Sequence, residues 1–194
     1  MRPLALLTCG ALGREVKAIV DRHGWDADIH GVPALHHLDP RRIVAAVDAR
    51  LADLTPRYRR VVVVYGDCGT AGALDAVLER HGAARVRGPH CYEMLAGEAA
   101  FARIAEERPG TFFLTDWLVR SFERAVVRPL GLDRHPELRD VYFANYTDVL
   151  YLAQFPDERL VAGAEEIARF LGLRLEVRRA GLGELESRLA ELVG

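Results

Sequence analysis

The sequence lacks the features that would place it in several common classes of protein. It has only three cysteines, an odd number, which excludes a framework of disulfides of the kind that staples small secreted domains. No apolar run approaches the ~20 residues that a membrane-spanning helix needs. The N-terminal residues run directly into an apolar strand without a cleavage site for a signal peptidase. We therefore expect a cytoplasmic protein.

Charge of one sign is also not concentrated anywhere in the chain. The 26 basic and 28 acidic residues give a formal net charge of −2, and the arginines are interspersed with acids. Nucleic acid and membrane surfaces are therefore not expected partners. There is no internal repeat, no low-complexity segment, and no glycine pattern of a phosphate-binding loop or a dinucleotide fingerprint. With half of its 194 residues apolar, the chain can form a substantial core, and we expect a single domain over residues 1–194.

Strand-like and helix-like patterns alternate along the whole chain. The run Val61 to Tyr65 is typical of a strand buried on both faces of a parallel sheet. Such alternation predicts an α/β fold, a Rossmann or flavodoxin-like three-layer sandwich with a mostly parallel sheet. Residues 116–148 are a candidate helical insertion in it. The strands are expected at residues 4–8, 29–32, 61–65, 84–87, 111–115, 149–153 and 173–178. Among the helices, one is expected to begin with Asp39 as its cap and Pro40 in its first turn, and others are expected over residues 92–107 and 158–171.

Each cysteine stands where an apolar strand ends and a helical pattern begins. These residues are Cys9, Cys68 and Cys91. In an open parallel sheet, the carboxyl ends of the strands share one edge, where ligands bind. A strand order 2-1-3-4-5 makes the three cysteine-bearing strands neighbours, whereas the order 3-2-1-4-5-6 separates them. For each cysteine taken alone, inert burial is the ordinary alternative; their joint placement favours a shared site.

Three thiols at one sheet edge suggest a metal site. Near helix N-termini, thiols are expected to have lowered pKa values and to bind zinc or a [4Fe–4S] cluster as thiolates. His90 is a candidate fourth ligand or acid/base group, and Glu15 is a second candidate catalytic residue. Five further residues are candidates for binding a cofactor or substrate. The three glycines would let the ligand approach the backbone closely, and the tryptophan and the asparagine would contact it. They are Gly10, Gly66, Gly69, Trp117 and Asn145.

Several motifs together resemble one known family. They are Thr8-Cys9-Gly10-Ala11-Leu12, Tyr65-Gly66-Asp67-Cys68-Gly69, Pro89-His90-Cys91, Pro109 to Thr115 with Trp117, and Phe143-Ala144-Asn145-Tyr146-Thr147. They are similar to motifs of the DUF1638 family of uncharacterised proteins, over residues 4–152. The resemblance implies a common fold and a common cysteine site without an established reaction. It also suggests a link to corrinoid methyl-transfer systems.

Three function classes follow from these residues. The first is a metalloenzyme, a metal-thiolate-dependent transferase or lyase, in which three cysteines hold zinc or a [4Fe–4S] cluster and leave a position open for a small substrate. The second is a noncatalytic carrier or accessory protein for a metal or a corrinoid, partnered by a protein of a corrinoid system. The third is a metal-free enzyme with Cys9 or Cys68 as nucleophile and His90 as base. Whether the protein is an enzyme is left open by the sequence.

Overall fold

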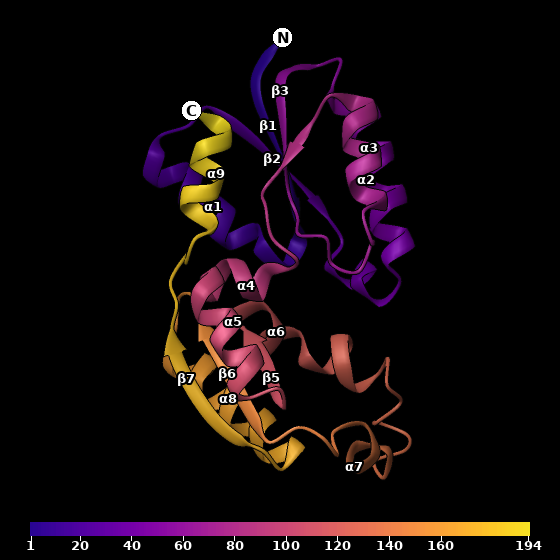
Figure 1. Ribbon diagram of the computed structural model, residues 1–194, viewed down its shortest axis with the longest axis vertical. Helices are drawn as coiled ribbons and strands as arrows, with labels where there is room; N and C mark the ends of the chain where they lie inside the picture. Colours follow the sequence, from indigo (N-terminus) through magenta and orange to yellow (C-terminus); the bar gives the residue numbers. More distant parts are fainter. The chain divides into compact units, whose positions relative to one another are not determined.

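Two compact units make up the computed structural model, which describes residues 1–194 (Figure 1). The first unit consists of Met1–Met94 and Glu184–Gly194, and the second of Leu95–Gly183. Each has its own parallel sheet, so the chain has the layered, Rossmann-like α/β architecture expected from the sequence. The single domain over residues 1–194 stays a prediction. None of the helices combines the length and the apolar character needed to cross a membrane.

The sheet of the first unit has four parallel strands in the order β2-β1-β3-β4. They are β1 (Arg2–Cys9), β2 (Ala27–Val32), β3 (Tyr58–Val64) and β4 (Ala84–Arg85). This is the order 2-1-3-4 that brings the cysteine-bearing strands together.

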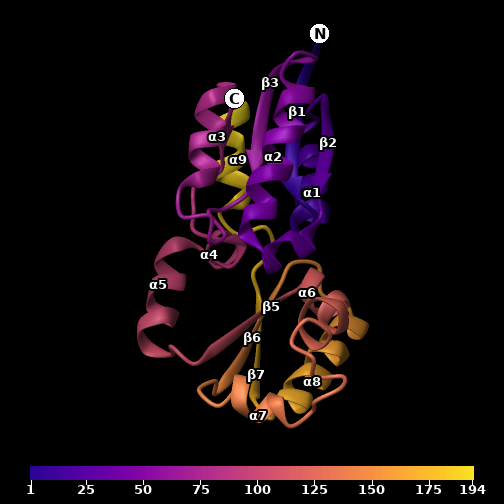
Figure 2. The same cartoon turned by 90° about the vertical axis from the view of Figure 1, so that its right-hand side faces the viewer.

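Helices cover both faces of this sheet (Figures 1 and 2). The helices α1 and α9 lie on one face, and α2 and α3 lie on the other. Asp39 begins α2 as its N-cap, with Pro40 in the first turn, as the sequence predicts. The helical segments of this unit are η1 (Gly10–Leu12), α1 (Gly13–His23), η2 (Ala34–Leu38), α2 (Pro40–Leu54), α3 (Ala73–His81) and α9 (Leu185–Val193). The helix α4 (Cys91–Ala96) begins in this unit and ends in the second.

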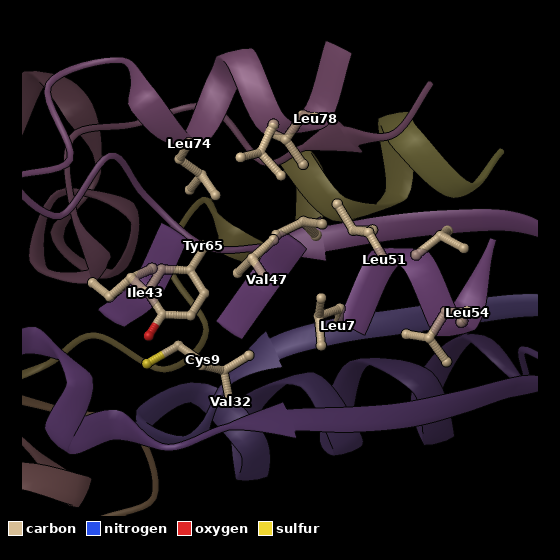
Figure 3. Packing of buried hydrophobic residues seen from close by; sticks show 14 of the residues in the cluster. Leu7, Cys9, Val32, Ile43, Val47, Leu51, Leu54, Tyr65, Leu74 and Leu78 are labelled. Atoms are coloured by element: carbon tan, nitrogen blue, oxygen red, sulfur yellow. The ribbon is translucent and has the colours of Figure 1, made fainter. Parts of the chain in front are cut away.

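In β1 and β3, every second side chain points into the core beneath α2 and α3. In β1 these are Ala5, Leu7 and Cys9, and in β3 they are Val61 and Val63, followed by Tyr65. Because successive side chains of a strand point to opposite faces, Cys9 and Tyr65 end the same inward-facing rows. Thr8 pairs with Val64 in the register, so Cys9 and Tyr65 both stand one residue beyond a paired position. Figure 3 shows both side chains at one end of the core.

The second unit has a parallel sheet of three strands in the order β5-β6-β7. They are β5 (Thr111–Thr115), β6 (Asp148–Ala153) and β7 (Arg174–Arg179). Figure 2 shows α5 on one face of the sheet and α6 and α8 on the other. The helical segments are α5 (Glu98–Glu107), α6 (Asp116–Phe122), η3 (Glu123–Val127, a π-helical turn), α7 (Leu138–Tyr142) and α8 (Glu158–Leu171).

The expectation that a fifth strand lies in the same sheet as the first four is wrong. β5 pairs with β6 and not with β4. β4 contributes only two residues to the first sheet, too short an edge to align a further strand. The helix expected over residues 92–107 is also interrupted, because Gly97 has φ +85°.

Residues 116–148, the candidate insertion, cover the connection from β5 to the first residue of β6 and carry α6, η3 and α7. Several of their apolar side chains belong to the core of the second unit, so the candidate insertion contributes to packing. These are Leu118, Phe122, Val127, Leu132 and Phe143.

Candidate functional site

The three cysteines lie at the carboxyl edge of the first sheet. Cys9 ends β1, Cys68 lies in the loop after β3, and Cys91 opens α4 in the connection after β4. Each pair is close enough for one thiol to raise the pKa of the other. The three sulfur atoms are nevertheless not all within 4.8 Å of one another, so they are not arranged as a finished zinc site. The sequence thus correctly predicted the edge but not a ready set of ligands.

The loops that carry Cys68 and Cys91 are bound to each other. The Asp67 N–H donates to the Gly88 carbonyl oxygen at 3.1 Å, and the Cys68 N–H donates to that of Pro89 at 2.7 Å. A Cβ atom at Gly66 would lie only 2.7 Å from the Cα atom of His90, so only glycine permits this approach. Gly66, expected to contact a cofactor, serves here to pack one loop against the other.

Asp67 organises the loop after β3. Its carboxylate accepts hydrogen bonds from the N–H groups of Gly69, Ala71 and Gly72 and from the Thr70 hydroxyl. These bonds, that of Gly72 above all, lower the pKa of Asp67. They also hold Cys68 at φ +50°, a left-handed conformation that costs a non-glycine residue about 1–2 kcal/mol. Gly69, next in the chain, has φ +81°.

Cys9 is buried, and its sulfur accepts the N–H of Ala11 at 3.4 Å. Cys9 is therefore the N-cap of the short 3-10 helix η1, whose first residue is Gly10. A Cβ atom at Gly10 would lie 3.1 Å from the Val32 carbonyl oxygen, a tight contact against the chain after β2. Glu15 is buried on α1, and its charge raises the pKa values of Cys9 and Cys91. Glu15 therefore lies near the cysteines, and its catalytic role stays a prediction.

The thiol pKa values are raised, contrary to the expectation of lowered ones. Burial is the largest cause for each cysteine, and it outweighs the backbone N–H groups near the sulfur atoms. The pKa of Cys68 rises to about 12 and that of Cys91 lies well above its usual value. Cys68 also lies outside any helix N-terminus, because α3 begins at Ala73. Without a bound cation, the thiols are therefore neutral at physiological pH.

Tyr65 was missed by the sequence analysis, although it completes the same edge. Its side chain is fully buried, and its hydroxyl has no hydrogen-bond partner. The hydroxyl and the Cys9 thiol lie close enough to shift each other's pKa, yet their geometry is not that of a hydrogen bond. Leaving a buried hydroxyl unpaired costs about 1–3 kcal/mol. The sequence pattern that could have identified Tyr65 is the alternation of side chains along β3, which places Tyr65 on the same face as Val61 and Val63.

Histidines on two loops accompany this edge. The ring of His37 stacks on Tyr65 with 5.5 Å between centroids, and Nδ1 of the neighbouring His36 is buried without a partner. His90 accepts the N–H of Glu93 at Nδ1, at 3.4 Å, near the start of α4. Burial lowers the pKa of His90, which keeps the ring neutral at physiological pH.

A buried ion pair fixes the segment that carries Cys91. Arg188 of α9 donates to the two carboxylate oxygens of Glu93 at 2.7 and 2.6 Å, and to the Arg87 carbonyl oxygen at 2.8 Å. The two side chains are 9% and 6% exposed. Gly88 has φ +130°, and a Cβ atom there would lie 2.5 Å from the Glu93 carboxylate, so glycine is favoured there as well. The C-terminal helix therefore anchors the connection after β4, an effect that no local motif predicts.

Trp117 and Asn145, the other two expected site residues, belong to the second unit. Trp117 follows β5 and packs against the core of that unit, with the Arg124 guanidinium 5.9 Å from its ring centroid. Asn145 is exposed in the turn before β6. One residue thus stands at the carboxyl edge of the second sheet and the other at its amino edge. The structure does not bring them together.

The carboxyl edge of the second sheet is closed by hydrogen bonds around Asp116. This carboxylate is fully buried and accepts the Tyr151 hydroxyl at 2.7 Å and the N–H groups of Gln154 and Phe155 at 3.0 and 2.9 Å. The Asp116 N–H in turn donates to the Gln154 side chain at 2.8 Å. All these groups are mutually satisfied, as in a structural network.

Comparison with known proteins gives one match. The model of a family described as "Protein of unknown function (DUF1638)" matches residues 32–189. The matched region contains Cys68 and Cys91 and begins after Cys9. No curated protein and no solved structure matches the chain.

Proposed function

The chain belongs to the DUF1638 family, and we propose that it is a metal-binding protein whose site is formed by Cys9, Cys68 and Cys91. The observation that carries this proposal is the meeting of three thiols at one carboxyl edge, where Cys9 raises the pKa of Cys68 and both of them raise the pKa of Cys91. Three thiol ligands leave one coordination position for a small substrate, the arrangement that distinguishes catalytic from closed metal sites.

The chemistry of the residues at this edge supports a metal or cluster. Three neighbouring thiols form a soft donor set of the kind that selects zinc or iron–sulfur clusters. The unpaired Tyr65 hydroxyl beside Cys9 supports a ligand in the vicinity, because a buried polar atom without a partner needs an explanation.

Between the two candidates, the spacing favours the [4Fe–4S] cluster. Zinc–sulfur bonds of ~2.3 Å in a tetrahedron would require sulfur atoms about 3.8 Å apart. The sulfurs here are not all within 4.8 Å. A cluster spreads its three cysteine ligands over separate iron atoms and tolerates the wider spacing. Zinc is the alternative, and it would require the three sulfur atoms to move closer together.

The raised thiol pKa values weigh against a cysteine nucleophile that works without metal. Such an enzyme needs a thiolate, which requires a nearby base or cation to lower the thiol pKa. Here burial and the charge of Glu15 act in the opposite direction on Cys9 and Cys91. A coordinated metal removes the difficulty, because it deprotonates a bound thiol outright.

In this proposal each residue of the edge has a defined role. The cysteines are the ligands, and a bound metal or cluster would supply Lewis acidity toward a substrate at the open position. His90, neutral at physiological pH, is the candidate for moving a proton, and the buried Glu15 is the second such group. The reaction class we favour is group transfer or elimination on a small molecule. A metal or corrinoid carrier would use the same ligands without the two acid/base groups.

The test is anaerobic purification followed by elemental analysis and an absorption spectrum of the full chain. We expect stoichiometric metal in the wild type and its loss in each of Cys9→Ser, Cys68→Ser and Cys91→Ser. The variants should keep native circular dichroism, because the apolar core does not depend on the metal. His135→Asn, at an exposed histidine of the second unit, is the matched control and should keep its metal.

Two results would contradict the proposal. One is an anaerobically prepared wild type without metal. The other is wild-type metal content in all three serine variants. If neither the metal-loaded wild type nor the metal-loaded His90→Ala variant turns over any substrate, the carrier function is favoured over the enzyme.

A further inference from the structure

The unpaired hydroxyl of Tyr65 is the starting point. Two buried side-chain polar atoms lack a hydrogen-bond partner, Tyr65 Oη and His36 Nδ1, and both lie at the carboxyl edge of the first sheet. Tyr65 is fully buried. In native proteins, buried polar groups are almost always paired. An unpaired group next to three thiols therefore points to a state of the site in which it gains a partner.

The direction of the hydroxyl identifies that partner. Tyr65 and Cys9 end adjacent rows of the same sheet face, and Figure 3 shows the hydroxyl directed toward the Cys9 sulfur. The electrostatic effect of each group on the other confirms that they are neighbours. Stacking of the His37 ring on the phenol restricts its position from the other side.

The chemistry of the two groups fits a hydrogen bond from the phenol to a metal-bound sulfur. A neutral thiol is only a weak acceptor, whereas a thiolate attracts a hydroxyl donor strongly. The backbone N–H groups of Ala11 and Leu12 are the other donors at the Cys9 sulfur.

We infer that Tyr65 is a positioning residue of the three-cysteine site, whose hydroxyl donates a hydrogen bond to the Cys9 sulfur when that sulfur binds metal. This inference rests on the proposed function. It adds a donor outside the ligand set that orients the Cys9 thiolate and stabilises its charge. Groups of this kind typically contribute 10–100-fold to metal affinity, and hydrogen bonds to sulfur tune the electronic properties of clusters.

The experiment compares Tyr65→Phe with Tyr58→Phe in the full chain, both prepared anaerobically. Phenylalanine keeps the packing of the ring and removes only the hydroxyl. Tyr58 begins the same strand, and its hydroxyl donates to Asp28 at 2.6 Å, far along β3 from the cysteines. The readouts are the rate at which a chelator removes iron or zinc and the charge-transfer absorption of the loaded protein. Circular dichroism verifies folding of both variants.

We expect Tyr65→Phe to bind stoichiometric metal, to lose it about 10-fold faster or more, and to show a shifted absorption band. Tyr58→Phe should behave as the wild type does in both metal readouts, whatever its stability. A Tyr65→Phe protein with wild-type release and spectrum would overturn the role of Tyr65 and leave the metal site standing. A wild type that contains no metal would overturn both.

Discussion

The two sheets of this protein end in carboxyl edges of opposite character. At the second edge, the hydroxyl of the buried Tyr151 donates to Asp116, which also binds two backbone N–H groups. At the first, the equally buried Tyr65 has a hydroxyl without a partner, and its neighbours are thiols. Burial raises the pKa of both tyrosines, so both keep their protons.

The difference separates a structural edge from a candidate binding edge. A network that satisfies all its polar atoms has no remaining capacity for a ligand, and its value is rigidity. An edge with an unpaired donor and three soft donor atoms retains that capacity at a cost in stability. The following three predictions test this contrast, in order of expected effect.

The largest effect is expected from Asp116→Ala. It leaves the Tyr151 hydroxyl and the N–H groups of Gln154 and Phe155 without their acceptor, all in the interior. We expect a loss of about 3–5 kcal/mol in the free energy of unfolding, measured by urea titration. Asp133→Ala, which removes an exposed aspartate with a weak ion pair to Arg134, should change it by less than about 0.5 kcal/mol. If the two variants were equally stable, the hydrogen bonds of Asp116 would not stabilise the second edge, and the contrast between the two edges would fail.

A pair of matched substitutions compares the two tyrosines directly. Tyr151→Phe deletes a hydrogen bond to a carboxylate and should destabilise the protein by about 1.5–3 kcal/mol. Tyr65→Phe in metal-free protein deletes an unpaired hydroxyl and should be neutral or stabilising by about 1 kcal/mol. Urea titration of both variants at one pH measures the difference. If Tyr65→Phe were as destabilising as Tyr151→Phe, the hydroxyl would have a structural partner in solution and the contrast would fail.

The smallest effect concerns the acid sensitivity of the first edge. The pKa of Asp67 is lowered mainly by the N–H of Gly72, so its charge stabilises the folded state. That contribution is complete above the pKa of about 3.9 in the unfolded chain and is lost as pH falls through the lower folded pKa. Asp67→Ala should cost about 1 kcal/mol at pH 7. The gap between wild type and variant should narrow below pH ~4, as followed by urea midpoints over pH 3 to 7.

A gap independent of pH would show that the Asp67 carboxylate is not what holds the loop. Thr70→Ala, which removes only one of the four donors to Asp67, is the appropriate intermediate variant and should retain the acid dependence.

Much of the fold is readable from the sequence, because it depends on local pattern. The apolar run of β3 and the Asp39-Pro40 start of α2 lie where the pattern predicts them. β5 (Thr111–Thr115) and α8 (Glu158–Leu171) are found with the predicted bounds. Less could be read where a single residue overrides the pattern, as Gly97 does in dividing α4 from α5. The number of sheets was missed because strand pairing depends on edges distant in sequence.

For the candidate site, the sequence identified the cysteines, Glu15 and His90, since each follows from a strand-to-helix junction or its neighbourhood. It did not identify Tyr65 or the Glu93–Arg188 ion pair. Tyr65 resembles any apolar strand residue until its hydroxyl is found unpaired. Arg188 is nearly a hundred residues from Glu93 in the chain, and only folding brings them together.

The sequence by itself determined the alternation of strands and helices and the placement of the thiols at strand ends. These depend on side-chain periodicity and on the direction of parallel strands, which are local properties. Only the tertiary structure decided that the chain forms two sheets and that burial raises the thiol pKa values. It also decided which tyrosine is paired and which is not. Desolvation and hydrogen-bond satisfaction depend on everything that surrounds an atom, and those surroundings come from segments far apart in the sequence.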